Sequence, residues 1–114
     1  MENKRRLIRI EVEDFLEIQP LNEVAKMFEG KAKDLSLIGV CFSSQVQWQK
    51  WQVLLIDYFL HNELDSVKLK VVVIWSEFID SKNGYFCGGE IIEVEDKMQA
   101  KFANYYFQRL KQAL

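Results

Sequence analysis

The alternation of apolar and polar residues that begins at Val67 constrains the fold of this chain more than any other feature. A period of two predicts a β-strand with one buried face, because successive side chains of a strand point to opposite sides. The Asn83-Gly84 pair then supplies the positive φ that a tight turn requires, and residues 85–94 are typical of a returning strand. The sequence therefore predicts a long β-hairpin. The residues predicted to face inward are Val67, Leu69, Val71, Val73 and Trp75, with Lys68 and Lys70 on the opposite face.

Residues 7–18 predict an earlier strand with one face in the core. The apolar face shifts phase at Asp14-Phe15, where we expect a bulge. Pro20 is expected to end the strand, because proline cannot donate a hydrogen bond to a neighbouring strand. The residues expected on the apolar face are Ile8, Ile10 and Val12.

Further short strands are predicted between this segment and the hairpin. Residues 31–42 indicate two strands interrupted around residues 34–36, and the apolar run at residues 53–60 indicates a buried strand. Residues 21–30 are expected to form a connection. Residues 45–52, rich in Gln and Trp, fit either a short helical turn or an edge of the sheet.

The last segment, residues 95–114, changes to helical spacing and predicts one amphipathic helix. We expect its apolar stripe to pack on the sheet. The fold class predicted is thus all-β with a C-terminal helix, and six short antiparallel strands in one small domain favour a closed six-stranded barrel. The single domain, residues 1–114, divides into an N-terminal segment (1–9), a barrel (10–94) and the helix (95–114). The stripe consists of Met98, Phe102, Tyr105, Tyr106, Leu110 and Leu114.

Composition and isolated residues exclude several classes of function. The net charge of -2 and the pI near 5.4 argue against general coating of nucleic acids. The lone His61 and the two cysteines, Cys41 and Cys87, match no metal-site spacing, and the cysteines are expected to be reduced and buried. We expect neither catalytic residues nor a cofactor. No apolar run is long enough for a membrane span and no signal peptide is visible, so a cytoplasmic protein is expected.

Basic residues cluster at the entrance to the first predicted strand, in a chain that is acidic overall. Guanidinium groups suit phosphates, which they bind through paired N–H groups, and their faces stack on aromatic rings. Taken alone, a charged terminus is most simply a solvated one. The cluster consists of Lys4, Arg5, Arg6 and Arg9.

A second motif, Asp34-x-Ser36-x-x-Gly39, changes this interpretation. Asp34 and Ser36 are two residues apart, so on an extended segment they would point the same way. A carboxylate can accept from the N–H groups on the edge of a guanine, with the hydroxyl as a second contact, and Gly39 allows a close backbone approach. The alternative is a turn in which both side chains bond the local backbone.

The two motifs in this order, on an all-β plan with a terminal helix, resemble the PilZ domain family over nearly the whole chain. The resemblance implies a six-stranded antiparallel barrel that binds the bacterial second messenger cyclic di-GMP. It implies that Arg5 and Arg9 engage phosphates and guanine faces, and that Asp34 and Ser36 recognise a guanine while Gly39 shapes the backbone. A basic residue at the position of Lys4 often accompanies a stacked pair of ligands in the family. Arg6 is then an additional, secondary contact.

The sequence therefore predicts a bacterial cyclic di-GMP receptor that signals to a protein partner by changing conformation. Motility, pilus, secretion or biofilm machinery are the partners that the resemblance implies. One alternative is a PilZ-like adaptor that binds no nucleotide. Another is a small barrel that binds single-stranded nucleic acid, against which the acidic pI argues.

Overall fold

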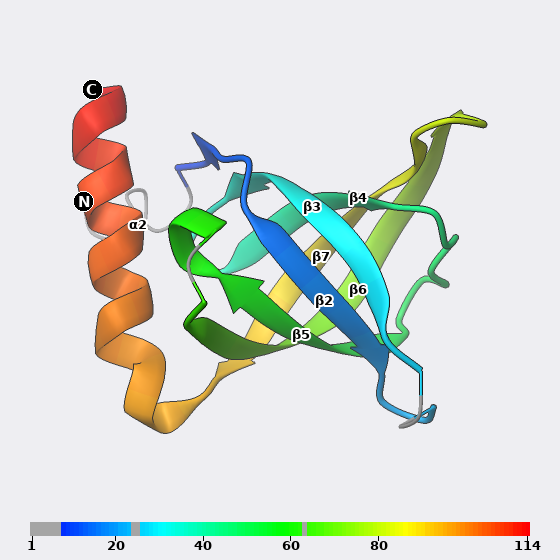
Figure 1. Ribbon diagram of the computed structural model, residues 1–114, viewed down its shortest axis with the longest axis horizontal. Coiled ribbons are helices and arrows are strands. Elements are labelled where there is room, and N and C mark those ends of the chain that lie inside the picture. Colours follow the sequence, from blue (N-terminus) through cyan, green and yellow to red (C-terminus); the bar gives the residue numbers. More distant parts are fainter. Residues whose placement is uncertain (1–7, 24–25, 63) are drawn as a thin grey trace.

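The computed structural model describes residues 8–23, 26–62 and 64–114, which form a β-barrel with a helix beside it (Figure 1). Short 3-10 helices, Leu60–Asn62 (η1) and Asp96–Met98 (η2), follow β5 and β7, and α2 spans Gln99–Ala113. The strands are β1 (Ile10–Glu11), β2 (Phe15–Pro20), β3 (Phe28–Leu35), β4 (Gly39–Ser44), β5 (Val53–Phe59), β6 (Ser66–Asp80) and β7 (Gly84–Val94).

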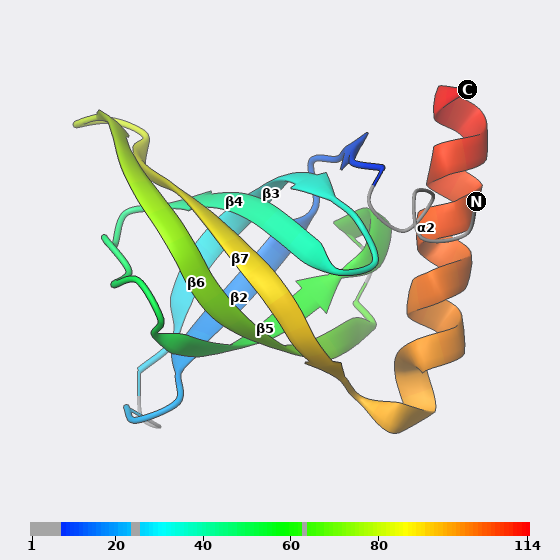
Figure 2. The same ribbon diagram turned by 180° about the vertical axis from the view of Figure 1, so that it is seen from behind.

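Six antiparallel strands close the barrel in the order β3-β2-β5-β6-β7-β4, and β4 pairs back onto β3. The predicted six-stranded antiparallel barrel is therefore confirmed, and Figure 2 shows β4 and β7 side by side on its rear wall. The two-residue strand β1 is an addition. It pairs with the last two residues of β3, beyond the point where β2 has ended its pairing with that strand.

The barrel interior is filled by alternating side chains, as the period of two predicts, and Val67, Leu69, Val71 and Val73 are all buried. Trp75 departs from this pattern and is 44% exposed. The register of β6 against β7 shifts between Val73 and Trp75, which turns the indole outward over Gly88. A Cβ on Gly88 would lie only 2.1 Å from Trp75 Nε1, so the ring rests directly on the backbone.

Two expectations for the first half of the chain are wrong. The strand β3 begins at Phe28, inside the expected connection, because Phe28 and Gly30 pair with Ile18 and Leu16 of β2. The apolar face of residues 10–18 also has no phase shift. Asp14 occupies an inward position and is only 4% exposed, so the alternation runs unbroken from Ile10 to Ile18 with a carboxylate in place of an apolar side chain.

The buried Asp14 carboxylate joins the barrel to α2. It accepts hydrogen bonds from Tyr58 on β5, at 2.6 Å, and from Tyr105 on the helix. Burial, followed by the charge of Asp14, raises the pKa of Tyr58, so its hydroxyl stays a proton donor. The apolar stripe of α2 packs on the barrel as predicted, except for Leu114, which is exposed. The stripe's buried members are Phe102, Tyr105, Tyr106 and Leu110.

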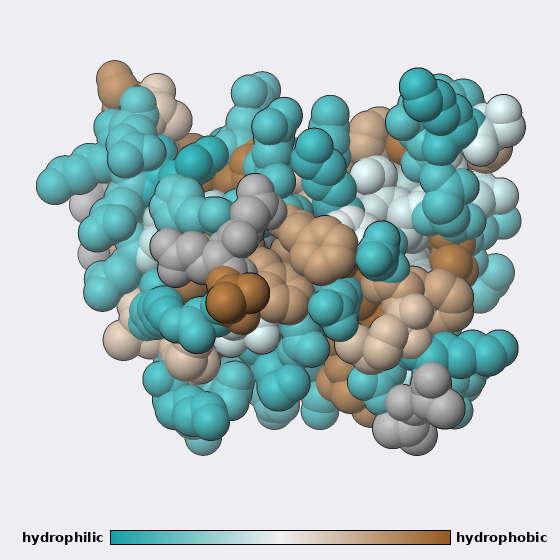
Figure 3. Space-filling view, viewed as in Figure 1, coloured by the Kyte–Doolittle hydropathy of each residue, from teal (hydrophilic) through white to brown (hydrophobic). Residues whose placement is uncertain are grey.

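The outer surface of the barrel is mostly polar. In the face that Figure 3 shows, hydrophilic side chains surround several small, separate apolar patches. Among the described residues, no helix combines the length and the apolar character that a membrane crossing demands.

Replacing Asp14 with Ala should lower the free energy of unfolding by about 3 kcal/mol, because two buried tyrosine hydroxyls would lose their acceptor. Urea denaturation followed by circular dichroism measures this loss. Glu13→Ala is the matched control, since Glu13 is the exposed neighbour on the opposite face. An Asp14→Ala protein as stable as the control would contradict the structural role assigned to this carboxylate.

Candidate functional site

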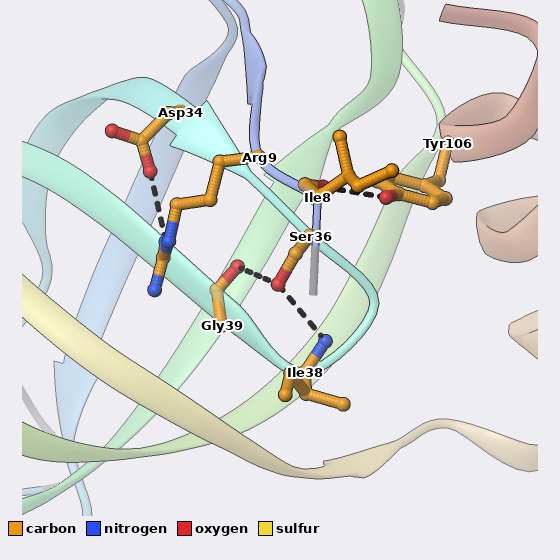
Figure 4. A network of polar contacts seen from close by, with 7 residues as sticks. All are labelled: Ile8, Arg9, Asp34, Ser36, Ile38, Gly39 and Tyr106. Atoms are coloured by element: carbon orange, nitrogen blue, oxygen red, sulfur yellow. Dashed lines mark hydrogen bonds and ion pairs between the residues drawn. The ribbon is translucent and has the colours of Figure 1, made fainter. Parts of the chain in front are cut away.

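Pairing of β1 with β3 brings Arg9 beside Asp34. Ile10 lies opposite Leu35 and Glu11 opposite Asp34, so Arg9, directly before β1, extends over the end of β3. Its Nη1 donates to Asp34 Oδ1 at 2.8 Å, across a separation of 25 residues in the sequence (Figure 4). The two side chains are 47% and 33% exposed, respectively. An ion pair this accessible to water contributes only about 0–1 kcal/mol to stability, so the fold does not depend on it.

Gly39, the first residue of β4, lies directly against the Arg9 guanidinium. A Cβ added to Gly39 would be 2.8 Å from Arg9 Nη2 and 3.2 Å from the carbonyl oxygen of Gly89. The absence of a side chain therefore makes room for the arginine. Three residues that the sequence singled out, Arg9, Asp34 and Gly39, come together in one place.

A bulge in β3 makes Asp34 face outward. The pairing of β3 with β4 slips between Ala32 and Asp34, which leaves Lys33 without a partner in the ladder. Ala32 and Leu35 are both buried, so Lys33 and Asp34 lie together on the outer face. Bulges commonly redirect side chains in this way at the sites where proteins bind ligands.

Ser36 does not share the outer face with Asp34. It is 1% exposed, and its hydroxyl donates to the carbonyl oxygen of Gly39 at 3.4 Å and accepts from the N–H of Ile38 at 3.3 Å (Figure 4). The backbone N–H of Ser36 also donates to Gly39, at 2.8 Å. The expectation of a shared face fails because the chain turns into the β3–β4 hairpin loop at this residue. The Ser36 hydroxyl instead makes local hydrogen bonds within that loop.

The helix α2 holds the backbone on both sides of Arg9. The hydroxyl of Tyr106 donates to the carbonyl oxygen of Ile8 at 2.5 Å, and Arg109 Nη2 donates to that of Glu11 at 3.2 Å. Sequence reasoning missed these two contacts. The only signal for them is the spacing of three residues between Tyr106 and Arg109, which places both on the same side of a helix.

An open groove of about 950 Å³ runs along the outside of the barrel and includes Asp34 in its wall. This volume lies at the upper end of the range typical of small-molecule sites, roughly 300–1,000 Å³. Arg9 is not among the residues that line the groove, so Asp34 is the residue that the groove shares with the ion pair. The charged and polar residues of the wall are Glu11, Glu13, Asp14, Lys31, Lys33, Asp34, Ser43, His61, Asn83 and Arg109.

The remaining candidate residues have these positions. Lys4, Arg5 and Arg6 lie outside the described residues. Cys41 lies opposite Asp34 in the pairing of β3 with β4, and it is half-buried rather than buried as expected. Burial, followed by the charge of Asp34, raises the pKa of the Cys41 thiol to about 11, so the thiol is protonated at neutral pH. Cys87 is buried and free, as expected. In the part of the chain that the structure describes, no group of three or more potential ligands could hold a metal ion.

Comparisons with known proteins rest on structure alone, since neither a protein-family model nor a curated protein matches the chain. The inhibitor of motility MotI/DgrA of Bacillus subtilis superposes with a TM-score of 0.74 at 16% identity, over 92% of this chain. The chain spans only 50% of that protein's length. The PilZ domain of YcgR from Escherichia coli, solved with cyclic di-GMP, has a TM-score of 0.67 at 15% identity, over 93% of this chain and 91% of its own. The barrel, with its strand order and its C-terminal helix, therefore has the PilZ fold.

Proposed function

We propose that this protein is a receptor for cyclic di-GMP rather than an enzyme. The observation that carries the proposal is the meeting of Arg9 and Asp34 over Gly39, outside the barrel, where an ion pair has little value for stability. The similarity in fold to the YcgR domain, which was solved with this ligand, supports the choice of ligand.

The chemistry of the two side chains suits a guanine dinucleotide. The guanidinium of Arg9 can bind a phosphate through its N–H groups and stack its face on a purine. Asp34 binds Arg9 through Oδ1, and a carboxylate has about four lone-pair sites, so it can also accept from N1–H and the 2-amino group of guanine. The ion pair thus orients both groups before the ligand arrives.

The other motif residues complete this site in the proposal. Arg5 supplies the second phosphate-binding guanidinium, with Lys4 and Arg6 as accessory cations. Ser36 acts by holding the hairpin loop, and Gly39 by admitting the arginine. The stoichiometry of a titration, in ligands bound per chain, distinguishes a single bound ligand from a stacked pair.

Asp34→Ala and Arg9→Ala should each weaken cyclic di-GMP binding by about a hundredfold or more, because each removes a charge-assisted contact with the ligand and the group that orients its partner. Isothermal titration calorimetry measures this change.

Asp57→Ala is the matched control. Asp57 is another half-buried strand aspartate with a basic partner, Lys68 at 3.0 Å, and it lies outside the groove. Its variant should bind as wild type does. Equal affinities for the Asp34 and Asp57 variants would refute the assignment of the site.

Gly39→Ala should reduce binding about tenfold and lower the melting temperature less than Gly30→Ala does. The new methyl group would displace the flexible end of Arg9, which can move, but the guanidinium would leave its position over the site.

Gly30→Ala should instead lower the melting temperature and leave the affinity for cyclic di-GMP nearly unchanged. Its Cβ would lie 2.7 Å from Leu16 Cδ1 and 2.9 Å from the carbonyl oxygen of Ser43, inside the packed barrel. Calorimetry and thermal unfolding of both variants separate the two effects, and a Gly39→Ala protein that binds normally would argue against the site.

The helix α2 is the proposed route from the ligand to a cytoplasmic protein partner. Tyr106 and Arg109 hold the carbonyl oxygens of Ile8 and Glu11, so a movement of Arg9 toward the ligand shifts atoms to which the helix is bonded. A ligand changes a conformational equilibrium only through differential contacts of this kind. The proposed partner is a protein of the motility, pilus, secretion or biofilm machinery.

Cyclic di-GMP should therefore change amide hydrogen exchange in residues 99–113, because the helix shares hydrogen bonds with the segment that binds the ligand. Mass spectrometry measures this exchange. Tyr106→Phe removes one of the two bonds and should reduce the change while the affinity stays within about threefold of wild type. Saturating ligand that leaves exchange in α2 unaltered would rule out this route.

A further inference from the structure

The groove continues past Asp34 to Lys33 and Phe86, which the motifs do not include. Because of the bulge in β3, Lys33 and Asp34 are consecutive residues that face the same side, so an ammonium and a carboxylate lie next to each other. An unbulged strand would point one of the two into the barrel. The bulge therefore extends the charged surface of the site along the outer face of β3.

Lys33 rests on an aromatic ring and not on a carboxylate. Its Nζ is 5.4 Å from the centre of the Phe86 ring, and within the described ranges it makes no ion pair. Phe86 is half-buried on β7, opposite Ser43 of β4, and its ring forms part of the groove wall. A cation above the ring of a half-buried phenylalanine is a contact of modest strength, which a stronger anionic partner can replace.

We propose that Lys33 and Phe86 form a second subsite, which binds the other half of the dinucleotide. This inference rests on the proposed function and extends it. The ammonium of Lys33 binds a phosphate, and the Phe86 ring stacks on the second purine, while Arg9 and Asp34 hold the first.

The shape and charge of the groove agree with this arrangement. Its volume of about 950 Å³ leaves space beyond the single guanine that Asp34 can recognise. Glu11 and Glu13 also line the groove and would repel a phosphate. Lys33 and Phe86 thus mark the part of the wall where a phosphate and a purine find a cation and an aromatic ring together.

Calorimetric titration of cyclic di-GMP into Lys33→Gln and Phe86→Leu tests the subsite. Each variant should raise Kd about tenfold, as expected when a charge-assisted contact or a stacked base is lost. Loss of Lys33 should also make Kd less dependent on salt between 50 mM and 300 mM NaCl, since one cation no longer meets the ligand.

Two variants elsewhere serve as matched controls. Lys50 lies over Trp51, with its Nζ 5.0 Å from the ring centre, but neither residue lines the groove, so Lys50→Gln removes the same kind of contact. Phe78→Leu removes an exposed ring from β6, also outside the groove. Both controls should bind as wild type does, with the same salt dependence.

The outcomes separate the two proposals. Wild-type affinity and salt dependence in Lys33→Gln and Phe86→Leu, with binding still lost in Asp34→Ala, would overturn the second subsite alone. Wild-type protein that binds no cyclic di-GMP would overturn the proposed function and the subsite with it. Melting temperatures within a few degrees of wild type exclude misfolding as the cause of lost binding.

Discussion

Pairing of the two-residue strand β1 with the end of β3 is the constraint on which the site depends. It places Arg9 next to Asp34, from segments 25 residues apart, and it lays the guanidinium on Gly39. Strand pairing fixes this approach more firmly than the ion pair itself, which is too exposed to contribute much to stability. The geometry of the site is thus set by the backbone, while the charged groups stay accessible to a ligand.

The helix α2 supports this arrangement through its hydrogen bonds to the segment that carries Arg9. Tyr105 donates to the buried Asp14 carboxylate, which fixes the helix to the barrel. One residue further along, Tyr106 holds the carbonyl oxygen of Ile8. A rigid attachment and a contact with the segment that carries Arg9 are therefore adjacent on one helix. This adjacency suits an element that reports occupancy of the site to a partner.

The sequence predicted the features that arise from repeated patterns. Alternation over long runs indicated the barrel strands, and the helical stripe indicated α2. The resemblance to the PilZ family, which the two motifs carry, implied that Arg9 and Asp34 belong to one site. Features that depend on a single residue were not predicted from the sequence. The bulge at Lys33 breaks no visible pattern, since Lys-Asp is compatible with an outer face in either register. In the sequence Asp14 indicates a change of phase, because a buried carboxylate cannot be distinguished from an exposed one until its tyrosine partners are known.

The central claim is that the Asp34 carboxylate, oriented by Arg9, recognises a guanine in a cyclic dinucleotide. Parallel calorimetric titrations of the unmodified protein with cyclic di-GMP and cyclic di-AMP test it most directly. Adenine lacks the N1–H and 2-amino donors that the carboxylate would accept, and sites built to hydrogen-bond a group reject ligands that lack it. The guanine dinucleotide should bind with micromolar or tighter affinity, and the adenine dinucleotide should bind at least about a hundredfold more weakly. Equal affinity for both, or no binding of cyclic di-GMP, would contradict it.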